Sequence, residues 1–206
     1  MAEKDLGFIH RYVPAQAAGL PPLLLLHGTG GDENDLLPLG PLIAPGAALL
    51  SPRGKVLEGP MPRFFRRNED GVWDIGDLNV RTADLASFVK EARAAYGLER
   101  SIAVGYSNGA NVAWSLMLHD PALLAGAILM RATMPFDPPP EPDLTDIPVL
   151  ILSGASDVMS RPDQREHLAA VLMRAGAQVT HEILPTGHGL IERDIAAARD
   201  WFAARF

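Results

Sequence analysis

A serine between an apolar run and a helical segment constrains the fold of this chain more than any other feature. Residues 102–104 are apolar, residues 105–109 read GYSNG, and residues 110–118 have the composition of a helix. A strand, a tight turn with glycine at both ends and a helix together form a nucleophile elbow, whose strained serine backbone leaves no room for bulky neighbours. The pattern predicts strands followed by helices and marks Ser107 as a nucleophile.

Two later apolar runs end in residues that would complete such a site. Asp157 follows residues 148–152, and His188 follows residues 179–185. Because the carboxyl ends of parallel strands meet at one edge of a sheet, we expect His188 to accept the proton of Ser107 and Asp157 to hold the imidazole. Asp163 is the alternative acid, although its place after Pro162 favours a role at a helix start.

A glycine-rich turn supplies hydrogen-bond donors for a negatively charged oxygen. The four leucines at 23–26 form a buried strand that is followed by the residues HGTGG. The backbone N–H groups of Thr29 and Asn108 are the expected oxyanion hole, because glycines let this backbone approach a substrate. We expect His27 to hold the turn, whereas the remaining histidines are expected at the surface or at helix ends: His10, His119, His167 and His181.

The chain resembles the bacterial carboxylesterase, lysophospholipase and acyl-protein-thioesterase-like branch of the α/β-hydrolases. The resemblance covers nearly the whole chain, in order, through the segments LLLLHGTGGDENDLLPL, SPRGKVLEGPMPRFFRR, GVWDIGDL, AVGYSNGAN, LILSGASDVMSRPDQ and PTGHGL. It implies the α/β-hydrolase fold and an ester or thioester hydrolase activity, without naming the substrate. Asn108 departs from the glutamine of many members, but the oxyanion hole needs only its backbone N–H.

The apolar runs predict one domain over residues 1–206 with a mainly parallel seven-stranded sheet and helices on both faces. The expected strands are 7–14, 22–27, 47–52, 101–106, 126–132, 148–154 and 179–185, of which the first two resemble a hairpin. Helices are expected near 80–96, ending at Gly97, and at the end of the chain, with Glu192 and Asp194 in its first turn. Residues 135–143 read as a surface loop too short for a cap domain, so we expect an open site.

Composition excludes several classes of function. The 206 residues are 48% hydrophobic, and the formal net charge of −7 disfavours binding to nucleic acid or to an anionic membrane. We expect no stable membrane insertion and a cytoplasmic protein, because there is no long apolar run and no signal-peptide pattern. The chain has no cysteine, no zinc-ligand spacing and no nucleotide-binding glycine motif, so neither a metal nor another cofactor is expected.

The segment 53–78 is the candidate substrate loop. Its large apolar side chains could wall an acyl pocket: Met61, Phe64, Phe65 and Trp73. One hypothesis is that Arg67, on the same face as Phe65 and Arg63 of an extended segment, binds a carboxylate or phosphate of the substrate. The alternative is a solvated loop in which Arg63, Arg66 and Arg67 form salt bridges with Glu69 and Asp70.

Taken together, these residues predict a serine hydrolase that cleaves carboxylic esters of small or medium acyl chains through an acyl-enzyme intermediate. A thioesterase or a lysophospholipase would use the same residues and differ only in the pocket. A noncatalytic ligand-binding protein on this fold would be expected to have lost one of them. A small-molecule ester is the expected partner, and the sequence is compatible with both a monomer and a homodimer.

Overall fold

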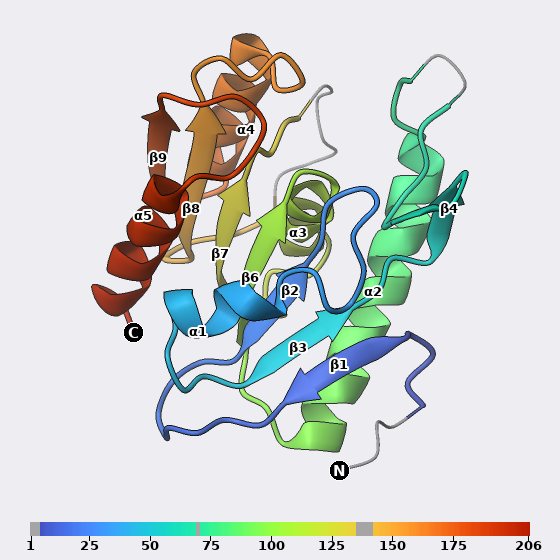
Figure 1. Cartoon of the computed structure of the whole chain (residues 1–206), viewed down its shortest axis with the longest axis vertical. Helices are drawn as coiled ribbons and strands as arrows, with labels where there is room; N and C mark the ends of the chain where they lie inside the picture. Colours follow the sequence, from blue (N-terminus) through green and yellow to red (C-terminus); the bar gives the residue numbers. More distant parts are fainter. Residues whose placement is uncertain (1–4, 69–70, 135–141) are drawn as a thin grey trace.

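The computed structural model describes residues 5–68, 71–134 and 142–206, which are built around a twisted seven-stranded sheet (Figure 1). The order across the sheet is β1-β3-β2-β6-β7-β8-β9. The seven strands are β1 (His10–Val13), β2 (Leu23–Leu26), β3 (Leu49–Pro52), β6 (Ser101–Tyr106), β7 (Leu124–Met130), β8 (Pro148–Gly154) and β9 (Gln178–Leu184). All seven expected strands are present, and six of them, all but β1, run parallel to one another.

The predicted hairpin at the start of the chain is wrong. Strand β1 pairs antiparallel with β3 instead of β2, so that β3 lies between them. The reason is burial: all four leucines of β2 are fully buried, which requires a central position with covered faces. Strand β1 (HRYV) has one exposed and two half-buried residues and can occupy an edge. His10, expected at the surface, is buried and lies 2.8 Å from the Tyr96 hydroxyl.

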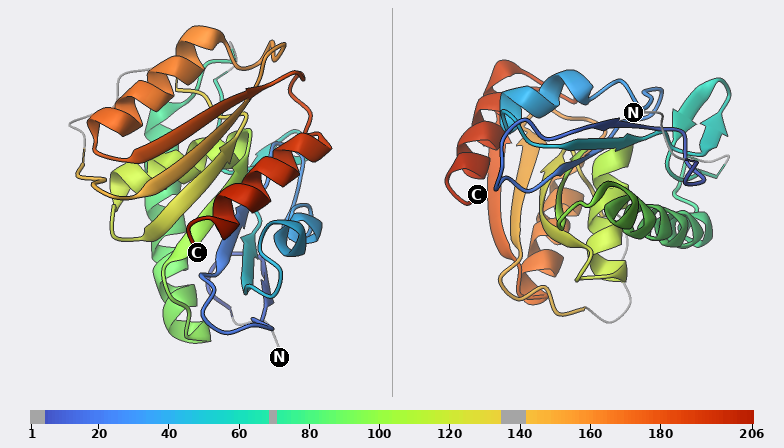
Figure 2. Two further views of the ribbon diagram at one scale, coloured as in Figure 1. Left: turned by 90° about the vertical axis from the view of Figure 1, so that its left-hand side faces the viewer. Right: turned by 90° about the horizontal axis from the view of Figure 1, so that it is seen from below.

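Helices cover both faces of the sheet, as the sequence predicts (Figure 2). One face carries α1 (Gly40–Ile43) and α5 (Glu192–Ala203), and the other carries α2 (Ile75–Tyr96), α3 (Asn108–His119) and α4 (Pro162–Arg174). An apolar cluster lies between each helix layer and the sheet. Leu24 and Leu26 of β2 belong to one cluster, and Leu23 and Leu25 belong to the other. A strand that is apolar on both sides therefore stabilises both layers.

Local signals fix where the longest helix begins and ends. Helix α2 starts before the predicted residue 80, because Asp74 caps it: Oδ1 of Asp74 accepts a hydrogen bond from the N–H of Asp77 at 2.9 Å. The helix ends at Gly97, whose φ of 66° is left-handed, as expected of a glycine stop. None of the helices in the described ranges has the length and apolarity needed to cross a membrane.

Two short strands occupy the segment expected to be a loop. Strands β4 (Val56–Glu58) and β5 (Met61–Arg63) form an antiparallel pair that lies beside the first turns of α2 in Figure 1. Most of the predicted surface loop over 135–143 lies outside the described residues. The described residues contain no cap domain over the carboxyl ends of the strands.

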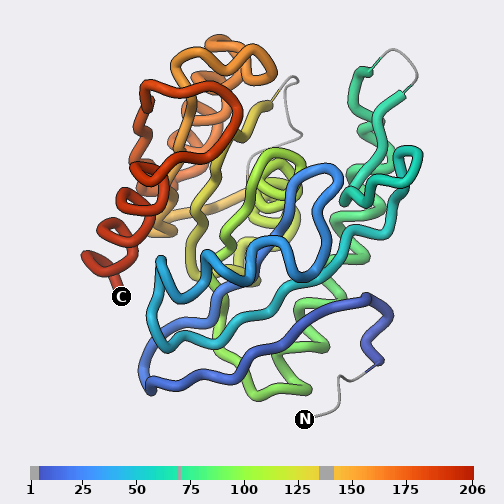
Figure 3. The backbone as a smooth tube through the Cα atoms, viewed as in Figure 1, coloured from blue at the N-terminus to red at the C-terminus, as the bar shows by residue number. Residues whose placement is uncertain are grey.

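The chain that follows β2 passes beside the start of α3, as the backbone trace in Figure 3 shows. A Cβ atom added to Gly109, in the first turn of α3, would overlap the backbone carbonyl groups of Leu26 and His27. Glycine at this position therefore lets the helix approach the strand closely.

We expect Gly109→Ala to lower the free energy of unfolding by about 1–3 kcal/mol or more, because backbone cannot move aside as a flexible side chain can. Gly76→Ala is the matched control in the first turn of α2, where the new Cβ would meet only Oδ1 of Asp74 at 3.4 Å. It should raise stability by about 0.5–1 kcal/mol through helix propensity. Urea denaturation of both variants measures the difference, and equal effects would contradict the close-packing argument.

Candidate active site

Ser107 occupies the turn between β6 and α3 in a strained conformation. Its φ of 52° and ψ of −115° are rare for a residue with a side chain, and it is the N-terminal cap residue of α3. The N–H of Ser107 donates to the carbonyl oxygen of Met130 on the neighbouring strand at 2.8 Å, which fixes the turn against β7. The serine thus stands at the carboxyl edge of the sheet, at the positive end of a helix dipole.

A chain of two hydrogen bonds joins the three residues that the sequence picks out. His188 Nε2 lies 2.9 Å from Ser107 Oγ, and His188 Nδ1 lies 2.8 Å from Asp157 Oδ2. The Asp157 carboxylate is buried, and its other oxygen accepts the N–H of Met159 at 2.9 Å. A carboxylate held at both oxygens fixes the imidazole with Nε2 toward the serine.

The alternative acid, Asp163, is engaged elsewhere. Its carboxylate pairs with Arg161 at 2.9 Å on the exposed first turn of α4. The structure therefore brings Asp157, and not Asp163, to His188, and Asp163 lies at a helix start as the sequence suggests.

Thr29 and Asn108 both line the pocket that contains Ser107. The turn that carries Thr29 is held by a hydrogen bond from the N–H of Gly30 to the Pro62 carbonyl oxygen at 2.9 Å. The side chain of Asn108 also has a partner, because its Oδ1 accepts the N–H of Phe64 at 2.7 Å. The Asn108 side chain thus ties the start of α3 to the segment 53–78, a role that backbone reasoning alone missed.

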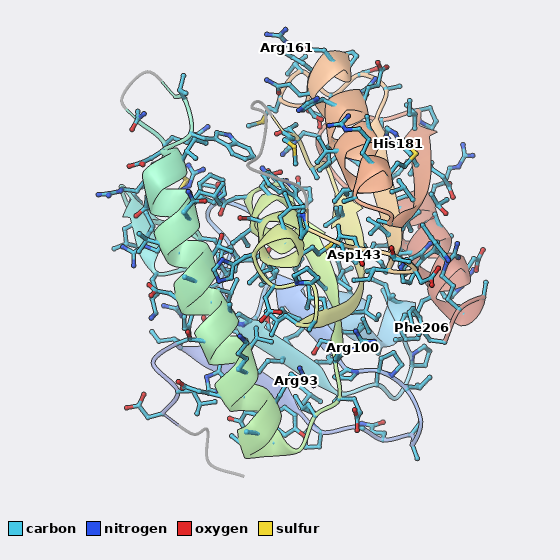
Figure 4. All side chains as sticks on the ribbon, turned by 180° about the vertical axis from the view of Figure 1, so that it is seen from behind. Arg93, Arg100, Asp143, Arg161, His181 and Phe206 are labelled. Carbon is cyan, nitrogen blue, oxygen red and sulfur yellow. The ribbon has the colours of Figure 1, made fainter. Side chains whose placement is uncertain are left out.

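The pocket at Ser107 has a volume of about 640 Å³. Its walls come from two segments that rise on either side of the strand ends in Figure 1, namely the segment before α2 and the segment around the start of α4. Arg161, labelled in Figure 4, marks the second of these at the start of α4. Apolar side chains on the walls are Val72, Trp73, Val158 and Met159, and polar ones include Asn111 and Thr133.

Two of the three predicted substrate-binding residues line this pocket. Trp73 and Arg67 are on its wall, whereas Phe65 is not. The Phe65 side chain is fully buried in the core under α2, with its ring centroid 4.9 Å from that of Trp73. The prediction for Phe65 as a pocket residue is therefore wrong, because its ring packs behind Trp73 and supports it. Phe64 is likewise buried, against the ring of His27.

The chain is 45% identical over 182 residues to MhqD of Bacillus subtilis (strain 168), which is named as a hydrolase. The match covers 87% of this chain and 91% of that protein. It matches no protein-family model. Its structure superposes on the Bacillus cereus carboxylesterase with a TM-score of 0.93 at 39% identity, covering 97% of this chain and 95% of that one. The chain belongs to the α/β-hydrolase family of esterases.

The structure also resembles that of YahD with malic acid, with a TM-score of 0.90 and 29% identity. That match covers 96% of this chain and 100% of YahD. These relatives include carboxylesterases and a hydrolase by name. This esterase-family protein is accordingly an enzyme with hydrolase activity. Within the ranges that the structure describes, no cluster of three or more metal-ligating side chains occurs in the esterase.

A buried ion pair next to His188 is the part of the site that sequence reasoning missed. Both nitrogens of the Arg131 fork lie 2.8 Å from the Asp194 carboxylate, and neither side chain is exposed. Arg131 also donates to the carbonyl oxygens of Gly187 and Gly189, the two neighbours of His188, at 3.1 and 2.9 Å. An arginine directly after a buried strand was the available signal, since a charge there needs a buried partner.

We expect Asp194→Asn to lower the free energy of unfolding by about 3–5 kcal/mol, because the Arg131 charge would remain buried without a counter-charge. Asp163→Asn is the matched control: it too removes an acid from the first turn of a helix, but its pair with Arg161 is exposed. That change should cost less than about 1 kcal/mol. Chemical denaturation measures both, and similar losses would contradict the buried-pair argument.

His27 holds the glycine-rich turn after β2, as expected. The N–H of Gly54 donates to His27 Nε2 at 2.9 Å, and Nδ1 lies 2.7 Å from the Gly28 carbonyl oxygen. Because an amide N–H can only donate, Nε2 is the unprotonated nitrogen and Nδ1 carries the hydrogen. Burial of the ring lowers the pKa of His27, despite hydrogen bonding to Gly28 and nearby carboxylates that raise it.

This lowered pKa predicts a loss of stability in mild acid. Below about pH 6.5 the unfolded chain protonates His27 while the folded chain resists, so the free energy of unfolding falls as pH falls toward the lowered folded value. In His27→Gln an amide oxygen can still accept from Gly54, but nothing titrates. We expect a weaker acid dependence in this variant by denaturation at several pH values; an identical dependence would overturn the assignment.

Proposed function

We propose that this protein is a serine hydrolase that cleaves carboxylic esters of small or medium acyl chains through an acyl-enzyme intermediate. The observation that carries the proposal is the hydrogen-bonded chain from Ser107 through His188 to Asp157, which opens into a pocket. A strained serine at a helix N-terminus, beside an imidazole oriented by a buried carboxylate, is suited to nucleophilic attack.

In the first half of the reaction Ser107 Oγ attacks the ester carbonyl carbon, and its proton passes to His188 Nε2. The carbonyl oxygen becomes negative and is stabilised by the backbone N–H groups of Thr29 and Asn108. Asp157 stabilises the imidazolium that forms. When the tetrahedral intermediate collapses, His188 returns the proton to the departing alcohol and the acyl group remains on Ser107.

In the second half a water molecule replaces the alcohol. His188 takes a proton from the water, whose oxygen attacks the acyl carbon. When the second intermediate collapses, the bond to Ser107 Oγ breaks, His188 returns the proton to that oxygen, and the acid is released. The acyl chain is proposed to lie against Trp73, Val158 and Met159, the apolar part of the pocket wall. A volume of about 640 Å³ suits small or medium chains.

An ester that carries a negative charge is a second candidate substrate. The solved structure of YahD, a protein at 29% identity, was obtained with malic acid, which is a hydroxy dicarboxylic acid. The arginines on the pocket wall of this chain, Arg63 and Arg67, supply a charge of the matching sign.

We expect a fluorophosphonate probe to label the wild-type protein and not Ser107→Ala, because the hydroxyl is nucleophilic only while His188 removes its proton. The same variant should lose turnover of para-nitrophenyl butyrate to the background rate. Mass spectrometry of the labelled protein identifies the modified residue. Ser101→Ala is the matched control, because this buried serine is the first residue of β6, whereas Ser107 follows its last residue.

Persistent labelling of Ser107→Ala, or turnover that survives in it, would refute the proposal. Chromogenic esters with acyl chains from acetyl to palmitoyl, compared with a thioester and a lysophospholipid, then distinguish the proposed esterase from the two alternative hydrolases. A maximum of kcat/KM at short or medium esters is the expected result.

A further inference from the structure

The pocket wall is positively charged although the protein as a whole is acidic. Among the described residues that line the pocket there are four arginines, Arg63, Arg67, Arg131 and Arg161, and no aspartate or glutamate. The chain as a whole has a formal net charge of −7. A concentration of one sign of charge in a hollow attracts a ligand of the opposite sign.

Two of these arginines differ from the others because they share a single carboxylate. Arg131 and Arg161 each have an aspartate of their own. Glu58 instead pairs with Arg67 at 2.6 Å and also with Arg63, so that this trio retains an excess positive charge. The neighbouring Arg66 turns to Asp74 and Asp77, and it is not on the pocket wall.

The buried member of the trio is short of partners. The Arg63 side chain is only 4% exposed, and among the described residues its Nε has no hydrogen-bond partner. Burial and the repulsive charge of Arg67 lower the pKa of Arg63, while Glu58 opposes both effects. A second anion beside the two guanidinium groups would offset this repulsion and supply further hydrogen-bond acceptors.

We propose that Arg63 and Arg67 form an anion subsite that selects esters bearing a carboxylate. The subsite lines the same pocket as Ser107. The backbones of Arg67 and Trp73 pair antiparallel, which places the subsite next to the apolar wall. One substrate can therefore place its reacting carbonyl at the serine and its carboxylate at the arginines. This inference rests on the proposed function and narrows its substrate class.

Matched pairs of esters test the subsite on either part of the substrate. On the alcohol side, para-acetoxybenzoate is compared with the neutral para-acetoxybenzamide, which carries the same acetyl group. On the acyl side, monoethyl glutarate is compared with ethyl valerate. The readout is the ratio of kcat/KM for the charged ester to that for the neutral ester, and the pair with the larger ratio shows which part of the substrate reaches the arginines.

Three variants give opposed expectations. Arg67→Gln should lower the ratio at least about tenfold, because a charge-assisted hydrogen bond to the carboxylate is lost. Glu58→Gln should raise it several-fold, because it removes the competing carboxylate and keeps a hydrogen-bonding side chain. Arg66→Gln removes the same charge from the adjacent residue, whose side chain is not on the pocket wall, and should leave the ratio near the wild-type value.

The outcomes separate the two proposals. If wild type hydrolyses the neutral esters, Ser107→Ala does not, and Arg67→Gln leaves the ratio unchanged, the anion subsite is refuted and the serine hydrolase stands. A fall in the ratio with Glu58→Gln, or equal falls with Arg66→Gln and Arg67→Gln, also refutes the subsite, because it indicates loop support or a diffuse field. If neutral-ester hydrolysis survives in Ser107→Ala, the proposed function itself fails.

Discussion

The fully buried ion pair between Arg131 and Asp194 connects the end of β7 to the start of α5, and the rest of the site depends on this connection. Arg131 follows β7, Asp194 lies in the first turn of α5, and the loop that carries His188 runs between β9 and α5. The same guanidinium donates to the carbonyl groups on both sides of His188. The position of the imidazole therefore depends on a fully buried charge pair, whose loss would leave one charge buried without a partner.

The charge of the pocket wall is opposite in sign to the net charge of the chain. The chain is acidic overall, yet the described wall of its pocket carries only arginines as charged side chains. Their acidic partners approach them away from that wall: Glu58 is on β4, and Asp194 is on α5. The net charge of the chain therefore does not describe the local charge at the pocket, which depends on where the acidic partners lie.

Two errors of the sequence analysis have one common cause. The first two strands are apolar and close in sequence, but β3 separates them because β2 must be covered on both faces. Phe65 has the composition of a pocket wall, but its ring is buried behind Trp73. In both cases a local pattern identifies apolar residues and leaves open what covers them, since burial depends on partners that are distant in the sequence.

The sequence by itself determined the seven strands, the two-sided helical cover, and the order of Ser107, Asp157 and His188 along the chain. It could do so because alternating apolar runs, glycine turns and strand-end residues are local signals that the parallel topology brings together. Only the tertiary structure decided the choice of Asp157 over Asp163, the Arg131–Asp194 pair and the sharing of Glu58 by two arginines. Such pairs form between residues far apart in the chain, and their energies depend on distance and burial, which no spacing encodes.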